Sequence, residues 1–183
     1  EEAYDGMREC RRLCRLAPPG IVGCVGLHAG FTLRDDMLRA AGELARELGA
    51  VVHTHVAEDA LDAAYARERG HRGALLRLLS LGALPAGSAL AHGIGLSQAE
   101  IAWAARCGLW LVHCPRSNAA NGLPYAAVLR QARRVALGSD GHPGAMTREL
   151  ASARTLGGAI GESPKVALQR LRAGWRLASQ RLG

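Results

Sequence analysis

Short apolar runs that alternate with helical segments constrain the fold of this chain more than any other feature. Five such runs occupy residues 21–27, 50–57, 89–92, 109–113 and 135–138, and none alternates polar with apolar side chains. Continuous apolar runs of this length are typical of parallel strands that are covered on both faces by helices. The sequence therefore predicts an α/β fold built from about five strand–helix units.

Helical spacing and end signals predict the segments between these strands. Ser97 with Glu100 forms a capping-box pattern, and Thr32 with Asp35 forms a similar one. The helices are expected over residues 2–16, 32–48, 61–69, 73–81, 124–132, 147–156 and 164–181, with one more that begins at Ser97. Residues 114–118 are expected to form a loop.

The length of the chain leaves two architectures open. A closed eight-unit barrel needs about 250 residues, whereas this chain has 183. It could therefore form an open five-stranded sheet or part of a (β/α)8 barrel. Because no linker rich in proline, glycine or serine divides the sequence, one domain is expected over residues 1–183.

The net charge of +7 does not predict a nucleic-acid partner. The basic residues are spread over the predicted helices and all but Lys165 are arginines, so no continuous basic patch is indicated. Aromatic residues make up only 4% of the chain, too few to stack the bases of a single strand. We therefore expect no binding of nucleic acid.

Targeting signals and cysteine usage indicate the compartment. No stretch approaches the roughly 20 apolar residues of a membrane helix, and the first residues lack a signal-peptide pattern. The five cysteines include no CxxC pair, which argues against a disulfide framework or a zinc ribbon. The expectation is a soluble, cytoplasmic protein without a membrane partner.

A histidine or an aspartate stands at the end of every predicted strand. These residues are His28, His55, His92, His113 and Asp140. Because the carboxyl ends of parallel strands meet at one edge, the five side chains are expected to lie near one another. Imidazole and carboxylate are ligands of Zn²⁺ and Fe²⁺. The pattern predicts a metal site, although a single histidine of this kind is more often structural.

Four ordered motifs resemble the amidohydrolase superfamily, in the branch of cytosine, guanine and adenosylhomocysteine deaminases. They are HTHVAE at 53–58, LAHG at 90–93, VHCPRSN at 112–118 and VALGSDG at 135–141. Their order is similar to that of strands five to eight of the family, and GLHA at 26–29 resembles the end of strand four. The Arg-Ser-Asn form and the GLHAGFT stretch are most similar to the aminohydrolases associated with selenium metabolism.

The resemblance implies a fold and an activity. The fold would be a partial (β/α)8 (TIM) barrel that covers about strands four to eight and is truncated at both ends. His55 would be the metal ligand from strand five, and Asp140 would be the ligand from strand eight and would also accept a proton. Glu58 would shuttle protons, and His92 would hydrogen-bond the attacking hydroxide or the substrate. The reaction would be hydrolytic deamination, at a C–N bond of a small heterocyclic substrate, with one divalent metal ion, zinc or alternatively iron.

Substrate contacts are expected from His28, His113, Ser117 and Asn118. For His28 and His113 a structural hydrogen bond is an equal alternative. Ser117 and Asn118 could instead simply cap the loop that follows Pro115.

Departures from the family leave further alternatives. Members carry a His-x-His pair on strand one, and no segment of this chain remains to supply it, unless residues 53–55 are that pair. The chain could therefore be a non-catalytic α/β fragment. A part barrel would also leave two strand edges and its apolar interior open, so self-association is expected.

Overall fold

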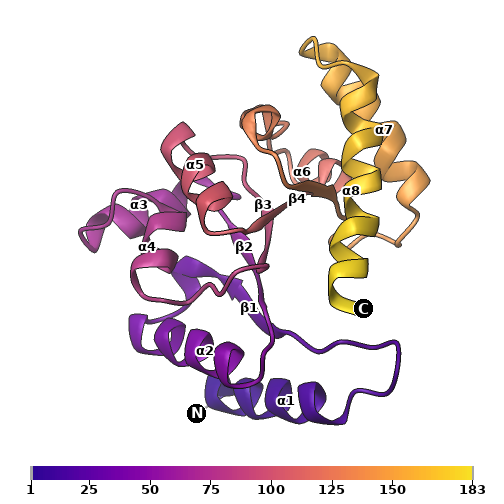
Figure 1. Ribbon diagram of the computed structural model, residues 1–183. Coiled ribbons are helices and arrows are strands. Elements are labelled where there is room, and N and C mark those ends of the chain that lie inside the picture. The colour runs from indigo at the N-terminus through magenta and orange to yellow at the C-terminus, as the bar shows by residue number, and fades with distance from the viewer. Residues whose placement is uncertain (1, 183) are drawn as a thin grey trace.

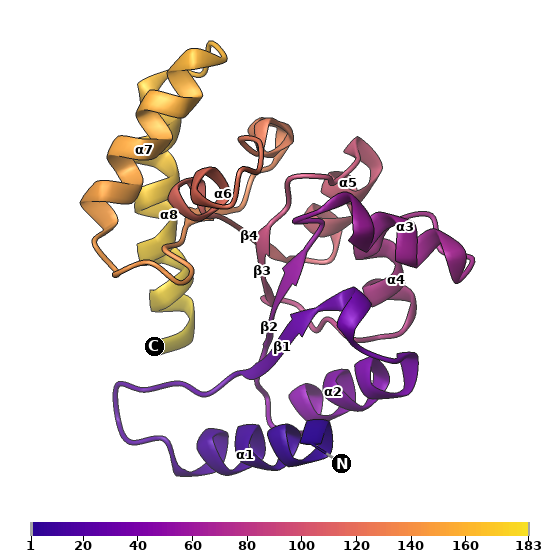
Figure 2. The same ribbon diagram turned by 180° about the vertical axis from the view of Figure 1, so that it is seen from behind.

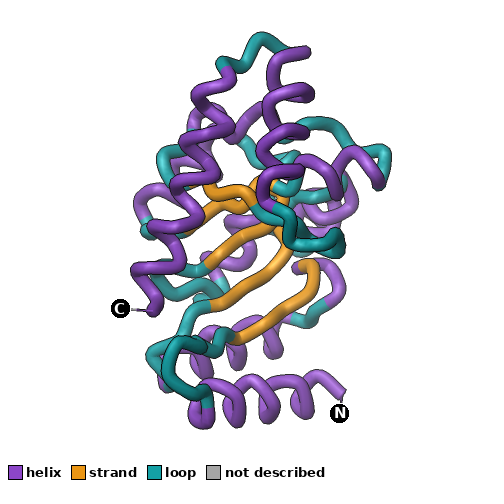
Figure 3. Tube along the Cα trace, turned by 90° about the vertical axis from the view of Figure 1, so that its right-hand side faces the viewer, coloured by secondary structure: helices purple, strands orange, loops and turns teal. Residues whose placement is uncertain are grey.

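A parallel five-stranded sheet forms the centre of the structure, a computed structural model that describes residues 2–182. The strands are β1 (Val25–Ala29), β2 (Val52–Val56), β3 (Ala89–His92), β4 (Trp110–His113) and β5 (Val135–Leu137). Each strand pairs in parallel with the next, so the order in space follows the order in the chain. The predicted α/β class is confirmed, and the strands lie side by side with a progressive twist (Figure 3).

Helices precede, connect and follow the strands. They are α1 (Glu2–Leu16), α2 (Asp35–Glu47), α3 (Ala60–Glu68), α4 (Ala74–Ser80), α5 (Gln98–Arg106), α6 (Pro115–Ala120), α7 (Met146–Ala159) and α8 (Pro164–Leu182), with 3₁₀ turns η1 (Gly30–Thr32) and η2 (Ala127–Gln131). Helices α2 to α5 lie together on one side of the sheet, and α8 runs alongside β5 (Figures 1 and 2). Within the described part of the chain, no helix has the length and apolar character that crossing a membrane requires.

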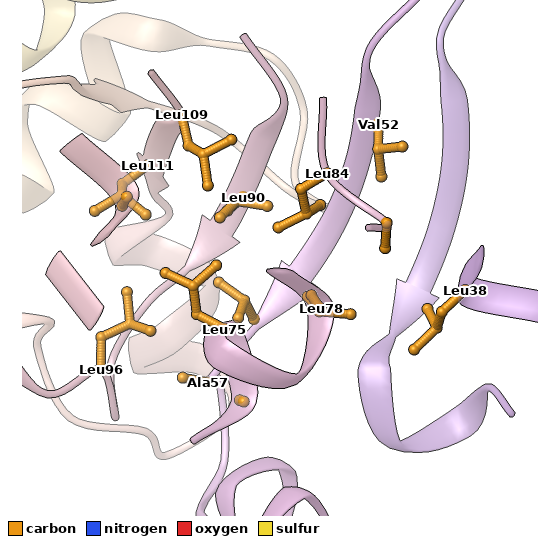
Figure 4. Packing of buried hydrophobic residues seen from close by; sticks show 14 of the residues in the cluster. Leu38, Val52, Ala57, Leu75, Leu78, Leu84, Leu90, Leu96, Leu109 and Leu111 are labelled. Carbon is orange, nitrogen blue, oxygen red and sulfur yellow. The ribbon is translucent and has the colours of Figure 1, made fainter. Parts of the chain in front are cut away.

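The main hydrophobic core lies between the sheet and helices α2 to α5. Val52 of β2 and Leu90 of β3 belong to one buried cluster with Leu75 and Leu78 of α4, and Figure 4 shows members of this cluster. Leu90 and Leu75 are fully buried, and such a side chain contributes about 1.5–3 kcal/mol to stability. This core fixes which side of each strand faces away from the helices.

The opposite side of the sheet, called the inner face below, carries smaller and more polar side chains. Along β2, Val52, Thr54 and Val56 are buried in the core, whereas His53 and His55 point to the inner face. A cavity of about 480 Å³ opens there. Its lining includes His53, His55, Ala89, Ala91, Val112, Cys114 and Asp140. The prediction that helices cover both faces of every strand is therefore wrong for β2, since its histidines face a cavity.

The starts of strand β1 and helix α2 differ from those that the sequence predicts. Residues 21–24 are not part of β1, and Ile21 and Val22 are exposed, because pairing with β2 begins only at Val25. Thr32 does not cap a helix. It lies in η1, where its hydroxyl donates to Ala29 O at 2.7 Å, and α2 begins after Arg34.

The helical starts elsewhere follow the sequence, with two exceptions. The capping box of Ser97 and Glu100 is present in both directions. Of the residues expected as a loop, 114–118, all but Cys114 lie in the short helix α6, with Pro115 in its first turn. Residues 124–132 contain the 3₁₀ helix η2 in place of an α-helix.

Candidate functional site

The carboxyl ends of β1, β2 and β3 bring three histidines together. The ring centroids of His28 and His55 are 5.1 Å apart, and those of His55 and His92 are also 5.1 Å apart. One ligand atom each from His55, Glu58 and His92 lies within 4.8 Å of the other two. Glu58 therefore shares the edge of the sheet with the histidines, and these groups form the centre of the candidate site.

Backbone conformation at the strand ends aims these side chains. Among the described residues other than glycine, Ala57, His92 and Asp140 have positive φ angles, of 48°, 71° and 49°. Side chains of L-residues crowd the backbone in this region, and such conformations cluster at functional sites. In a regular strand His92 would point to the same side as Leu90, into the core. The left-handed turn at His92 instead places its ring beside His55.

Asn118 fixes the orientation of the His92 ring. His92 Nδ1 lies 2.9 Å from Asn118 Oδ1, and both side chains are buried. With the amide oxygen as acceptor, Nδ1 carries the proton. His92 Nε2 is then directed at Glu58 Oε2, 3.5 Å away, and has no hydrogen-bond partner in the described structure.

This arrangement fits a bound cation. A lone pair on His92 Nε2 facing the Glu58 carboxylate is repulsive unless a proton or a metal ion lies between them. Burial, followed by the neighbouring His92, lowers the pKa of His55, which favours the neutral imidazole that a metal needs. The two imidazoles and the carboxylate are the donor types that Zn²⁺ prefers.

Asp140 lies at the end of β5 and lines the same cavity as His55. The Ser117 hydroxyl donates a hydrogen bond to Asp140 Oδ2. This bond, more than the nearby His92 and His55, lowers the pKa of the Asp140 carboxyl. Asp140 is therefore ionised at neutral pH, as either a metal ligand or a proton acceptor must be.

The residues expected to bind substrate fall into three groups. His28 lies against His55 at the candidate site. Ser117 and Asn118, both buried in α6, use their side chains to hold Asp140 and His92, so their observed contacts are those of positioning residues. His113 lies elsewhere.

His113 points away from the cavity, on the opposite side of β4 from Val112. Its Nδ1 accepts a hydrogen bond from Arg170 Nη1 at 3.1 Å, and its ring meets Tyr125 edge-on with centroids 4.5 Å apart. The expected substrate contact is therefore wrong for His113, whose contacts are the structural alternative. The physical reason is strand alternation, which sends adjacent side chains to opposite faces.

His113 is expected to make stability fall at acid pH. Burial, then the nearby Arg170, lowers its pKa from 6.5 to about 3. As the pH drops below 6.5 the unfolded chain takes up a proton that folded His113 excludes, so stability is lost until about pH 3. His113→Asn retains an acceptor but does not titrate, so urea unfolding should show about 2 kcal/mol less loss between pH 6.5 and about pH 5. An unchanged pH profile would contradict this, and His142→Asn, in the loop after β5, is the control.

Sequence reasoning did not identify the residues that support the site. The buried Glu162 and Arg170, which form a cluster with the half-buried Tyr125 behind His113, are one case, because charged residues on a predicted helix are usually solvated. Asp62, which binds the backbone beside Glu58, is another. The motif order carried a signal for the strand-end residues, and no pattern in the sequence marked these two groups.

Comparison with known proteins identifies the family. The sequence profile of the amidohydrolase family matches residues 4–174. The chain belongs to the amidohydrolase family. Within it, β1 to β5 follow one another in parallel, and β2 with its His-x-His pair has a paired strand before it. This position suits a middle strand of a barrel better than a first strand.

Amidohydrolase relatives include named deaminases. A 5-methylthioadenosine/S-adenosylhomocysteine deaminase of Nitratidesulfovibrio vulgaris is 35% identical over 120 residues, which are 64% of this chain and 27% of that protein. The corresponding deaminase 2 of Archaeoglobus fulgidus is 31% identical over 143 residues, 76% of this chain and 32% of that protein. The chain thus matches between about a quarter and a third of the length of these curated relatives.

Solved structures agree with this relationship. A zinc-bound adenosine deaminase from Xanthomonas campestris superposes with a TM-score of 0.75 at 29% identity, over 84% of this chain and 37% of that one. A guanine deaminase from C. acetobutylicum with bound guanine gives 0.79 at 19% identity, over 97% and 48%. The second likeness shows the fold alone, which is that of a partial amidohydrolase barrel.

Proposed function

We propose that this chain provides the catalytic edge of a metal-dependent aminohydrolase that deaminates a small heterocyclic substrate. The observation that carries the proposal is the cluster of His55, Glu58 and His92, with His92 Nε2 buried, unpartnered and directed at a carboxylate. Family membership supports the reaction class, hydrolysis of a C–N bond.

His55 and Asp140 would hold one divalent ion, zinc in preference to iron, with Glu58 and His92 beside it. The zinc in the adenosine deaminase of Xanthomonas campestris supports this choice of metal. When bound, the ion would supply Lewis acidity at the carboxyl edge of the sheet.

The side chains of this chain would perform the proton transfers. Asp140 is ionised and can accept a proton from water as the water attacks the ring carbon. Glu58, whose carboxylate is 3.5 Å from His92 Nε2, can carry a proton to the departing amine nitrogen. His92, oriented by Asn118, would hydrogen-bond the oxygen that adds to the substrate.

An amino-substituted purine is the substrate class that we favour. The named relatives act on adenine nucleosides, and the guanine deaminase holds guanine. The cavity on the inner face, at about 480 Å³, falls within the range of small-ligand sites. The narrower resemblance to aminohydrolases of selenium metabolism stays a prediction.

We further propose that β1 to β5 correspond to strands four to eight of a complete barrel. The other strands, and the His-x-His ligands expected on strand one, would come from another polypeptide segment. Self-association of this chain would cover the inner face without supplying them. The thiols of Cys10, Cys14, Cys107 and Cys114 suit a reducing compartment, so we place the protein in the cytoplasm. The competing function is a non-catalytic fragment that binds no metal.

Metal binding separates these two functions. The 183-residue chain is expected to bind one Zn²⁺, and His55→Ala should weaken binding at least tenfold, because it removes an imidazole ligand. The measurement is competition with a chromophoric chelator. His71→Ala, at a histidine that contacts Ser80 instead of the site, is the control. Equal Zn²⁺ affinity of the wild type and His55→Ala would support the non-catalytic alternative. The substrate class needs a separate test, which is ammonia release from a panel of aminopurines by the complete enzyme.

A further inference from the structure

Asp62 is not one of the candidate site residues, but it binds the backbone N–H of Ala57, which directly precedes Glu58. It lies in the first turn of α3, is 5% exposed, and accepts the Ala57 N–H at Oδ2 over 2.7 Å. Burial is the main cause that raises the pKa of this carboxyl, because the ionised carboxylate loses its contact with water there. One oxygen of this buried carboxylate accepts a hydrogen bond from a single backbone amide. This indicates that the position of the Ala57 amide is important for the candidate site.

Ala57 is the link between two site residues. It lies two residues after His55 and directly before Glu58, and its φ of 48° is unusual for a residue with a Cβ. Its N–H is held by Asp62, and its C=O accepts the Gly95 N–H at 2.8 Å. Both polar groups of Ala57 are therefore fixed, and the direction in which Glu58 leaves the chain is fixed with them.

Arg77 supplies the positive charge next to Asp62. Its side chain is 2% exposed, forms an ion pair with Asp35 at 2.6 Å, and donates to Gly30 O at 2.6 Å and to Leu33 O at 2.8 Å. A Cβ on Gly30 would lie 3.3 Å from Asp62 Oδ1 and 3.7 Å from Arg77 Nη1, so the two charged groups meet at this glycine. The same contacts anchor the segment that follows His28.

We propose that Asp62 is a positioning residue of the site, which holds Ala57 in its left-handed conformation and thereby directs Glu58 towards His92 and His55. This inference rests on the proposed function for its catalytic meaning, but the positioning itself is a property of the metal-free chain. The positive charge of Arg77 favours the ionised form of the buried Asp62 carboxyl. The hydrogen bonds of Arg77 to Gly30 and Leu33 connect this pair to the segment after β1.

A different role would give a different mutational pattern. If Asp62 served only as a counter-charge for Arg77, Asp62→Asn and Asp62→Ala would be equally harmful. If it serves as the acceptor for Ala57 N–H, Asp62→Asn should keep Ala57 in its left-handed conformation, because the side-chain amide oxygen of asparagine can accept the same hydrogen bond.

The test combines two measurements on the 183-residue chain. Hydrogen exchange of the Ala57 amide, followed by NMR without metal, should accelerate at least tenfold in Asp62→Ala and less than threefold in Asp62→Asn. Because a carboxylate oxygen of Glu58 lies within 4.8 Å of the ligand atoms of His55 and His92, the Zn²⁺ dissociation constant of this chain should rise about tenfold or more in Asp62→Ala and change little in Asp62→Asn. Asp59→Ala is the matched control, because Asp59 in the same loop accepts the Leu61 N–H at 2.8 Å and does not bind Ala57.

A double variant makes the assignment specific to Glu58. In a Glu58→Gln background, Asp62→Ala should cause no further loss of Zn²⁺ affinity, since the group that it directs has already been changed. Additive losses, or an Ala57 amide that exchanges as slowly in Asp62→Ala as in wild type, would overturn the proposal. A wild-type chain that binds no Zn²⁺ would count against the proposed function, and the exchange measurement alone would then decide the role of Asp62.

Discussion

Glu58→Gln is expected to lower the kcat of the complete enzyme by about 10²–10⁴-fold, the usual contribution of a general acid–base group. Glutamine is nearly isosteric with glutamate and cannot carry a proton. Because Glu58 Oε2 lies 3.5 Å from the unpartnered His92 Nε2, the loss should fall on the proton-transfer steps. KM should change much less than kcat. Steady-state ammonia release at saturating Zn²⁺ measures both constants.

The control for this variant is Glu68→Gln. Glu68 is an exposed glutamate at the end of α3, the helix that follows Glu58 in the chain. Its substitution should leave kcat within a factor of two. A Glu58→Gln enzyme with wild-type kcat would remove Glu58 from the proton relay and leave its proximity to His55 and His92 unexplained.

Arg170→Ala is expected to destabilise the folded chain by about 3–5 kcal/mol, the cost of removing one partner from a buried ion pair. Arg170 and Glu162 are 3% and 5% exposed and form two hydrogen bonds, of 2.8 and 3.1 Å. Tyr125 and His113 complete the cluster. Without the guanidinium, the Glu162 carboxylate and His113 Nδ1 lose their buried partner. The expected loss of stability is therefore larger than that from lost packing alone.

Urea unfolding at neutral pH measures this loss. Arg172→Ala, two residues further along α8 and exposed, removes the same side chain without a buried partner and should change stability by less than about 0.5 kcal/mol. Similar effects of the two substitutions would mean that the cluster does not bind α8 to β4. Double replacement of Arg170 and Glu162 should restore part of the loss, since it leaves no unpaired charge.

The sequence predicted the strand order and most of the strand-end residues because those signals are local. Five apolar runs each ending in histidine or aspartate fit a parallel sheet, and Ser97 with Glu100 forms the expected capping box. The first strand was placed too early because apolar Ile21 and Val22 look like strand residues, although they have no partner strand. Helix α6 is only six residues long, below the length at which helical periodicity can be recognised.

The remaining features depend on contacts between distant residues. His113 lies in the same motif as Ser117 and Asn118, yet strand alternation sends it to the other side of β4. Arg170 looks like any other arginine of a charged helix until Glu162 and Tyr125 are brought against it. No local pattern marks Ala57 as left-handed, because the constraint comes from Asp62 and Gly95.

The sheet order has a consequence for how such proteins can be recombined. Since each strand pairs only with its neighbours in the chain, the units of β2, β3 and β5 each bring their own side chain to the candidate site from a carboxyl end. Gly49 and Gly108 end helices just before β2 and β4 and adopt positive φ angles. Gene fusions joined at these two glycines would exchange the unit that carries His55 and Glu58, together with the next unit, which carries His92, between related enzymes. The unit that carries Asp140 would stay in place, so a chimera would acquire a new version of the proposed proton relay while keeping its proposed carboxylate ligand.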